Sequence, residues 1–425
     1  MLDIRYIRAN PDVIREAALK KNIDFEVDEL LEVDAERRRL IQSTDERKAQ
    51  QNRTSRKIAD LSGEERQQRI QEMQQLVGDI KSMGVELKSV TERFDNLMLQ
   101  VPNPPAAEVP DGKDDSENVE LRSWGTPRSF EFELRDHVEL GLLHDIVDFE
   151  RAAKLAGSRT YYLKGLGALL ELAVLRLALD HITGKGFVPM LVPNLVRPFA
   201  MFGTAYYPGG EEQSYQVEND GLSLIGTSEV PLTAYHASEI LALTDLPRLY
   251  AGWSSCFRRE AGTYGRDTRG LYRIHQFQKV EQVVLCTADE AVSLEFHQEI
   301  LKNSEEVLQM LELPYRVVNV CGGDLGRGQV QKFDLETWMP SRDSYSETHS
   351  ASRFHDFQSR RLNMRYRDAD GKVQFCHTLN NTVIASPRIL IPLLENNQQE
   401  DGSIDIPGAL QPYLNGRKRI EPPQK

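Results

Sequence analysis

Two long segments near the start of the chain follow the spacing of an α-helix. In residues 64–100 apolar positions recur every three or four residues, at Ile70, Met73, Val77, Ile80, Leu87, Phe94 and Met98. Residues 27–61 carry a poorer stripe, and both segments lack proline and are rich in strong helix formers. Since only a short Ser62–Gly63 break separates them, we predict two long helices that form an antiparallel hairpin.

The end of the first helix has a different character from its start. The stretch RKAQQNRTSRK, residues 47–57, has almost no apolar positions and includes Arg53, Arg56 and Lys57. One interpretation is a solvated coiled-coil face or a dimerisation rod, because charge on exposed helix faces is routine. The other is an arm whose cations contact RNA phosphates. The pattern alone does not separate these interpretations.

The pattern changes after the hairpin. Residues 101–120, VPNPPAAEVPDGKDDSENVE, contain four prolines and several acids, which is typical of a linker. Beyond them short strand-like runs alternate irregularly with helical segments near residues 168–183 and 287–312. We predict an α+β chain: a helical arm over residues 1–105, a linker over 106–120, and a domain over 121–425 built on a largely antiparallel sheet flanked by helices.

The composition of the chain argues against several classes of protein. The 425 residues carry a formal charge of −13, which argues against a protein that coats nucleic acid through bulk charge. The four cysteines form no CxxC pair, so we expect neither a structural zinc site nor a disulfide framework. The longest apolar run, GALLELAVLRLALDHI, is interrupted by Glu171, Arg176 and Asp180, and the chain start lacks a signal-peptide pattern. We therefore expect a cytoplasmic protein without membrane spans.

An arginine-rich stretch, CFRREAGTYGRDTRGLYRIHQFQKVEQVV, occupies residues 256–284 between two strand-like runs. Alternation predicts that the following side chains share strand faces: Arg258 and Glu260 on the first strand, and Arg273, His275, Phe277, Lys279 and Glu281 on the second. The loop between them adds Arg266 and Arg269. Burying such charges without a ligand is costly, so we predict a site for a polyanion. A solvated charged loop is the alternative interpretation.

Two further polar clusters leave their roles open. In LIGTSEVPLT, Thr227 and Glu229 follow an apolar strand and suit either a helix cap or a binding site. In DSYSETHSAS, Glu347 and Ser350 precede a basic helix start. Glu347 suits a magnesium site or an ordinary ion pair, and the local sequence does not decide between them.

A third cluster lies in CHTLNNTVIASPRILIPLLEN. Asn380 and Thr382 fall on one strand face. Ser386 is then a candidate N-cap, with Pro387 at the first helical position and Arg388 just inside the helix. Because a cation is unfavourable at a helix N-terminus, Arg388 is expected to bind an anion.

Taken together, these motifs resemble those of the seryl-tRNA synthetases, which are class II aminoacyl-tRNA synthetases with an N-terminal coiled-coil arm. GFVPMLVPNLV is similar to the first class II motif, CFRREAG with GRDTRG and HQFQKVE to the second, and HTLNNTVIASPRILIPLLENNQ to the third. The order of the elements in the middle motif is highly specific. The resemblance covers nearly the whole chain.

The resemblance implies a role for individual residues. For ATP it implies Arg258 at the α-phosphate, Glu260 and Phe277 at the adenine, Arg273 and Arg388 at the pyrophosphate, and Glu347 with Ser350 at Mg²⁺. The residues implied for serine are Thr227, Glu229, Arg258, Glu281, Asn380 and Thr382. In this family the three arginines, Arg258, Arg273 and Arg388, carry the catalysis.

The resemblance also implies an activity and partners. The chain would activate serine with ATP to seryl-adenylate and transfer serine to the 3′-terminal ribose of tRNA(Ser), and it would also charge tRNA(Sec). Arg53, Arg56 and Lys57 on the arm would contact tRNA backbone. A homodimer is expected through the apolar helix at residues 167–182 and the strand that contains Pro193.

One departure from the family pattern concerns Pro392, four residues after Arg388. A proline there removes a helix hydrogen bond, so we predict a kink or a distorted first turn, or a helix that starts elsewhere. Two rival functions remain at this point: an enzyme that passes its adenylate to another acceptor such as a carrier protein, and a non-catalytic RNA-binding paralogue. The intact arm argues against the first, and the retained site residues argue against the second.

Overall fold

The computed structural model describes residues 1–58, 60–262 and 269–422. Within these residues the chain divides into two compact units. The first unit comprises residues 1–19 and 23–104, and the second comprises residues 20–22 and 105–425 as far as they are described.

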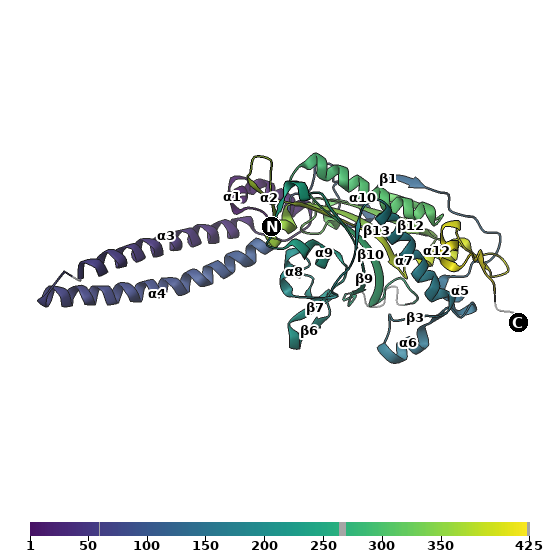
Figure 1. The fold of residues 1–425 in the computed structure, drawn as a ribbon, viewed down its shortest axis with the longest axis horizontal. Helices are drawn as coiled ribbons and strands as arrows, with labels where there is room; N and C mark the ends of the chain where they lie inside the picture. Colours follow the sequence, from purple (N-terminus) through teal and green to yellow (C-terminus); the bar gives the residue numbers. More distant parts are fainter. Residues whose placement is uncertain (59, 263–268, 423–425) are drawn as a thin grey trace. The chain divides into compact units, whose positions relative to one another are not determined.

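The first unit is helical. It contains α1 (Ile4–Ala9), α2 (Pro11–Lys20), α3 (Val27–Ile58) and α4 (Gly63–Gln100). The two long helices run side by side (Figure 1), and ion pairs join Arg93 to Glu29 (2.6 Å) and Arg47 to Asp79 (2.7 Å). Since the end of α4 thus meets the start of α3, the helices are antiparallel, which confirms the predicted hairpin.

The hairpin is buried mainly at its base. Its core there consists of Ile7, Ile14, Val27, Leu30, Val33, Phe94, Met98 and Val101. Farther along α4, Ile70 and Val77 remain 40% and 44% exposed. The predicted apolar seam is therefore closed at the base and open toward the tip, where Arg53, Arg56 and Lys57 are exposed.

The second unit is built on a sheet that, within the described residues, has eight strands in the order β1-β11-β12-β13-β16-β10-β9-β4. The strands are β1 (Val119–Trp124), β4 (Val188–Leu191), β9 (Arg248–Phe257), β10 (Gln276–Cys286), β11 (Tyr315–Asn319), β12 (Gln331–Met339), β13 (Ser344–His355) and β16 (His377–Ser386). Neighbouring strands are antiparallel except for β4 and β9. This confirms the largely antiparallel sheet.

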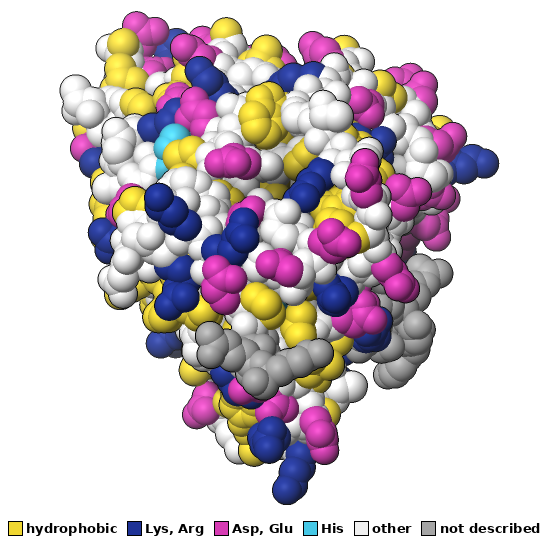
Figure 2. Space-filling model, turned by 90° about the vertical axis from the view of Figure 1, so that its right-hand side faces the viewer, with side chains coloured by type: hydrophobic (Ala, Val, Ile, Leu, Met, Phe, Trp, Pro, Cys, Tyr) yellow, Lys and Arg dark blue, Asp and Glu magenta, His cyan; other side chains and the backbone are white. Residues whose placement is uncertain are grey.

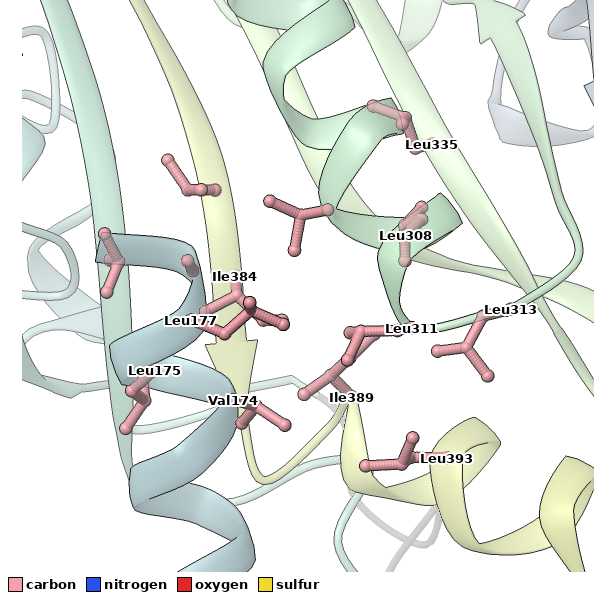
Figure 3. Packing of buried hydrophobic residues seen from close by; sticks show 14 of the residues in the cluster. Val174, Leu175, Leu177, Leu308, Leu311, Leu313, Leu335, Ile384, Ile389 and Leu393 are labelled. Carbon is pink, nitrogen blue, oxygen red and sulfur yellow. The ribbon is translucent and has the colours of Figure 1, made fainter. Parts of the chain in front are cut away.

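Three helices supply much of the apolar cover of this sheet: α7 (Leu166–Gly184), α10 (Glu290–Met310) and α12 (Leu390–Asn397). In Figure 3, Val174 and Leu177 of α7 lie beside Ile384 of β16, and Leu311 lies close to Ile389. Burying such side chains stabilises the fold by roughly 1.5–3 kcal/mol each. The core thus holds β10 and β16, which carry much of the site, in a fixed position.

Smaller elements surround this core. The short helices are α5 (His137–Leu143), α6 (Phe149–Ala156), α8 (Pro198–Gly203), α9 (Glu229–Thr233) and α11 (Phe357–Leu362). The small sheets are formed by β2 (Val147–Asp148) with β3 (Tyr162–Leu163), β5 (Leu195–Val196) with β6 (Gln216–Val217) and β7 (Leu222–Leu224), β8 (Ile240–Ala242) with β14 (Arg365–Arg367) and β15 (Val373–Phe375), and β17 (Ile404–Asp405) with β18 (Arg419–Ile420).

The predicted N-cap at Ser386 is wrong, whereas the expectation from Pro392 that the helix starts elsewhere is confirmed. Ser386 is the last residue of β16, and the helix begins at Leu390, so Pro387 and Arg388 precede it. The carbonyl of Arg388 accepts the N–H of Ile391 (3.1 Å), which makes a tight first turn. Pro392 is the third helical residue, where a missing N–H costs no intrahelical bond, and this is why the helix tolerates it.

The surface carries both charge signs. Figure 2 shows Lys and Arg side chains interspersed with Asp and Glu over the face it presents, and large areas of a single sign are absent from that face. The net negative charge is therefore not concentrated there. Across residues 1–58, 60–262 and 269–422, no helix has the length and apolarity needed to cross a membrane.

Candidate active site

A pocket that encloses about 510 Å³ of empty space, part of it open to solvent, lies at the β10–β16 region of the large sheet. Its described lining consists of Arg258, Glu260, Leu271, Tyr272, Ile274, Phe277, Lys279, Glu347, Thr348, Thr382, Ala385, Ser386 and Arg388. Six of the residues to which the sequence analysis gave a site role are among them: Arg258, Glu260, Phe277, Glu347, Thr382 and Arg388.

The arginine-rich stretch lines the pocket in two ways: Phe277 and Lys279 lie on β10 as predicted, whereas Arg258 and Glu260 belong to the connection between β9 and β10. Strand β9 ends at Phe257 and β10 begins at Gln276, so the prediction that Arg258, Glu260 and Arg273 lie on strands is wrong. Glu260 adopts a left-handed backbone (φ 52°), which ends the extended conformation and with it the alternation. The N–H of Arg258 still bonds the carbonyl of His275 (3.0 Å), so both chain segments stay together just past the sheet.

At one end of the pocket, guanidinium groups lie beside aromatic rings and a carboxylate. The guanidinium carbon of Arg258 is 5.2 Å from the ring centre of Phe277, and its Nε donates to the carbonyl of Gly226 (3.4 Å). Arg273 Nη1 lies 3.4 Å from Glu260 Oε2. Arg258 and Glu260 thus line the pocket, and Arg273 lies against Glu260.

Arg388 reaches the pocket from the segment that follows β16. Its Nε donates to the carbonyl of Tyr272 (3.3 Å), and its Nη1 donates to the carbonyl of Glu347 (3.1 Å). Its guanidinium carbon lies 4.6 Å from the Tyr272 ring centre, within cation–π range. These contacts hold the head group of Arg388 next to Glu347 even though Arg388 lies outside α12.

The inner end of the pocket contains a buried ion pair. Lys279 and Glu281 of β10 are 5% and 2% exposed and form a short salt bridge. The hydroxyl of Thr382 donates to the Glu281 carboxylate (3.3 Å). Because each partner compensates the desolvation of the other, either charge left alone would be strongly destabilising.

Glu229, at the start of α9, is a second buried carboxylate. It accepts hydrogen bonds from the Tyr206 hydroxyl (3.1 Å) and from the Gln358 amide (2.8 Å). Burial, reinforced by the negative charge of Glu281, raises the pKa of Glu229 to about 7. The Thr227 hydroxyl accepts the N–H of Glu229 (3.1 Å), so Thr227 stabilises the helix start while the Glu229 carboxylate belongs to the polar cluster.

Three residues with predicted roles lie near the pocket or at its rim. Asn380 is 5% exposed, and its side-chain nitrogen has no hydrogen-bond partner within the described part of the chain. Ser350 is not part of the pocket lining; it hydrogen-bonds Asp334, the residue opposite it on β12. Burial, with a smaller contribution from Glu347, raises the pKa of Asp334 to about 7. Glu347, Asp334 and Ser350 therefore form one oxygen-rich neighbourhood.

The sequence analysis placed two arginines, Arg266 and Arg269, in the loop of the arginine-rich stretch. Arg266 lies outside the described residues. Arg269 is exposed, and its Nη1 forms an ion pair with Asp136 Oδ2 (2.5 Å), the N-cap of α5. In this structure Arg269 therefore fastens the connection to α5.

The sequence analysis missed several site residues. Tyr206, Gln358 and Asp334 contact predicted residues across large sequence separations, and no local signal marks them. Lys279 was placed on a strand face without a role, although its period-two spacing from Glu281 was a usable signal. Tyr272, which contacts Arg388, had no signal beyond its position before His275.

Comparison with known proteins decides the family. A model of the seryl-tRNA synthetase N-terminal domain matches residues 1–105, and a model of the class II tRNA synthetase core domain (G, H, P, S and T) matches residues 214–397. A serine–tRNA ligase from Deinococcus radiodurans is 47% identical over 423 residues, covering 100% of both chains. The chain belongs to the seryl-tRNA synthetase family. It is an aminoacyl-tRNA ligase, a serine–tRNA ligase.

Solved structures agree with this assignment. The seryl-tRNA synthetase of Pyrococcus horikoshii, determined in complex with ATP, superposes with a TM-score of 0.92 at 40% identity and 100% coverage of both chains. The cytoplasmic serine–tRNA ligase of Naegleria fowleri, in complex with AMP, gives a TM-score of 0.86 at 32% identity, covering 100% of this chain and 99% of the other. The α+β architecture with an antiparallel helical arm is that of the family.

Proposed function

We propose that this chain charges tRNA(Ser) in two steps at the pocket described above. In the first step the serine carboxylate attacks the α-phosphorus of ATP, which forms seryl-adenylate and releases pyrophosphate. In the second step a hydroxyl of the 3′-terminal ribose attacks the carbonyl carbon of the adenylate, which releases AMP. The observation that carries the proposal is a pocket that is lined by Arg258 and Arg388 and extends to Lys279 and Thr382. Both of these residues contact the buried carboxylate of Glu281, whose charge in turn acts on Glu229.

The arginine end suits the nucleotide. We assign Arg258 to the α-phosphate, Phe277 and Glu260 to the adenine, and Arg273 with Arg388 to the outgoing pyrophosphate. The 5.2 Å approach of Arg258 to the Phe277 ring supports a phosphate contact next to a stacked base. Positioning two anions and neutralising the charge that develops between them requires no general base or nucleophilic side chain. The three arginines are therefore the proposed catalytic residues.

The inner end of the pocket suits serine. We assign Glu229 to the ammonium group, Glu281 and Thr382 to the side-chain hydroxyl, and Thr227 and Asn380 to the remaining polar atoms, while Arg258 also faces the carboxylate. The unpartnered amide nitrogen of Asn380 supports an acceptor from the substrate. Alanine would leave Glu281 and Thr382 without the hydroxyl, which can reduce kcat/KM by about 10⁴ in a site of this type.

Magnesium fits the residues at the rim. Glu347 and Ser350 supply hard oxygen donors, and Mg²⁺ typically binds through one or two carboxylates together with substrate phosphates. Asp334 holds the Ser350 hydroxyl in place. Once bound, the ion would neutralise phosphate charge, while Glu347 orients it and Arg388 stays fixed on the Glu347 carbonyl.

The remaining parts of the proposal concern partners. We place the tRNA-binding arm in residues 1–105, the linker in 106–120 and the catalytic domain in 121–425, working in the cytoplasm on tRNA(Ser) and also on tRNA(Sec). A homodimer would cover the exposed leucines of α7, Leu169 and Leu172, which are 48% and 51% exposed. Leu191 and Leu195, which flank Pro193, are 86% and 43% exposed, and we expect a homodimer to cover them as well.

The proposal is tested by serine-dependent ATP–pyrophosphate exchange, with alanine, glycine and threonine as controls, followed by charging of tRNA(Ser) in the same preparation. Exchange with serine and charging together support it. Exchange without charging would favour transfer to another acceptor, and the loss of both activities in a folded protein would favour the non-catalytic paralogue.

Removing the three exposed cations of the arm, with Arg53→Ala, Arg56→Ala and Lys57→Ala, is expected to raise the KM for tRNA(Ser) about tenfold and to flatten its salt dependence. The reason is that phosphate contacts release counterions. Pyrophosphate exchange should not change. The matched control replaces Arg367, Lys372 and Arg417, which are equally exposed in the second unit. If both triple variants behave alike in charging, the arm assignment is wrong.

The KM for serine is expected to rise as the pH falls below about 7, approaching tenfold per pH unit. The pKa of Glu229 is raised to about 7, so acid neutralises the carboxylate that binds the ammonium group. In a Glu229→Gln variant the KM for serine should be about tenfold higher at alkaline pH and nearly independent of pH. A wild-type profile that Glu229→Gln leaves unchanged would remove Glu229 from the serine site.

A further inference from the structure

Tyr272 forms a platform for cations beside the pocket. The guanidinium carbon of Arg342 lies 3.9 Å from the centre of the Tyr272 ring, and that of Arg388 lies 4.6 Å from it. Arg273 is 6.0 Å away, at the limit of a cation–π contact. These residues come from separate segments: Arg342 ends the 3₁₀ turn Pro340–Arg342 between β12 and β13, and Arg388 follows β16.

We propose that Arg342 is a further binding residue for the pyrophosphate portion of ATP and acts together with Arg388 across the Tyr272 ring. This inference rests on the proposed function, because it takes the Arg388 end of the pocket as the pyrophosphate end. None of the motifs in the sequence includes Arg342. Its turn has the sequence Pro-Ser-Arg and gave no signal of a binding role.

The first argument is distance. Both guanidinium carbons are close to one ring centre, so they can be no more than about 8.5 Å apart, the sum of the two separations. Two cations held so close repel each other, and the ring quadrupole offsets this only in part. A multivalent anion that contacts both would remove the repulsion. An arrangement of this kind is what a phosphate chain requires.

The second argument is charge. Within the described lining of the pocket the cations are Arg258, Lys279 and Arg388, and the carboxylates are Glu260 and Glu347. Lys279 is already paired with the buried carboxylate of Glu281. The charges that remain nearly cancel, whereas a triphosphate brings several negative charges into the pocket. Besides Arg273 next to Glu260 and the proposed Mg²⁺, Arg342 adds a positive charge, through its contact with the lining residue Tyr272.

The third argument is accessibility. Arg342 is exposed and sits on a short turn, so its long side chain can shift from the ring toward a ligand without disturbing the core. Its planar guanidinium can bind two phosphate oxygens at once, which a lysine cannot do. Arg388 is half-buried, and two hydrogen bonds to backbone carbonyls hold it. The pair therefore combines a half-buried guanidinium group with an exposed one.

The test compares Arg342→Met with Arg367→Met, which changes an equally exposed arginine on β14 whose Nη1 donates to the carbonyl of Gly371 (2.9 Å). Arg342→Met is expected to raise the KM for pyrophosphate and for ATP about tenfold in serine-dependent exchange, with the KM for serine changed by less than about twofold. Arg342→Lys should give an intermediate value, because it keeps the charge but loses the planar fork. Calorimetric titration of each full-length variant with ATP alone should show the same order.

The outcomes separate this inference from the function on which it rests. If Arg342→Met matches Arg367→Met in both assays while the wild-type protein exchanges pyrophosphate with serine, Arg342 does not bind the phosphates. An equal rise in all three KM values would show that Arg342 only braces Tyr272, and it would also overturn the inference. Absence of serine-dependent exchange in the wild-type protein would instead overturn the proposed function.

Discussion

Replacing Arg258 by glutamine is expected to lower kcat/KM for serine-dependent ATP–pyrophosphate exchange by about 10²- to 10³-fold, the loss typical of one donor aimed at developing charge. Arg258 is the only residue to which we give contacts with both reacting groups, the α-phosphate and the serine carboxylate. Its position depends on the Gly226 carbonyl and on the Phe277 ring. Glutamine keeps a hydrogen-bond donor but loses the charge, so the variant isolates the electrostatic contribution. The measurement is exchange kinetics at varied ATP and serine, with a thermal melt to verify folding.

A matched control is available at the start of β9, the strand that ends just before Arg258. Arg248 begins β9 and pairs with Asp245 (2.6 Å) at a site where both side chains are more than one-third exposed. Such pairs contribute roughly 0–1 kcal/mol, so Arg248→Gln should retain nearly full activity. If Arg258→Gln loses less than about tenfold relative to this control, Arg258 is not the central arginine of the site.

Replacing Glu281 by leucine is expected to destabilise the second unit by roughly 3–5 kcal/mol, because the ammonium group of Lys279 is then buried without its counter-ion. The same change removes the acceptor of the Thr382 hydroxyl and should abolish serine-dependent exchange. Urea unfolding followed by tryptophan fluorescence measures the effect. All three tryptophans of the chain, Trp124, Trp253 and Trp338, belong to the second unit, so the signal reports on that unit alone.

A double variant provides the decisive comparison. Lys279→Met together with Glu281→Leu replaces both charges by apolar groups, and such exchanges are often neutral or stabilising. We therefore expect the double variant to regain most of the lost stability while remaining inactive with serine. If the double variant is no more stable than Glu281→Leu alone, the destabilisation has a cause other than the unpaired ammonium group.

The helices of the arm were predicted correctly from the local sequence pattern. The sequence predicts helices over residues 27–61 and 64–100, and the structure has Val27–Ile58 and Gly63–Gln100. This agreement follows from a helix period that depends only on neighbouring residues, interrupted by one glycine-containing break. Strands β9, β10 and β16 of the large sheet lie where alternation predicted strands, since alternation is also a local property.

The errors occur where regular elements end. Alternation was extended past the last paired residues of β9 and β10, which misplaced Arg258, Glu260 and Arg273. Ser386 was predicted to be the N-cap, about one turn before the helix begins at Leu390. Arg388 was therefore wrongly expected inside the helix. The end of a strand depends on whether a neighbouring strand continues beside it, and a single stretch of sequence does not contain that information.

The sequence by itself determined the hairpin, the antiparallel sheet and the motifs that identify the family, because each depends on the spacing of residues that are close together in the chain. The tertiary structure alone decided which polar groups meet. Gln358 contacts Glu229 across 129 residues, and Arg342 lies on Tyr272 although the two belong to different connections. Whether Lys279 is a surface cation or the buried partner of Glu281 likewise depends on the distant segments that close around the pocket. Burial sets the energy of each charge, and burial results from the packing of distant segments.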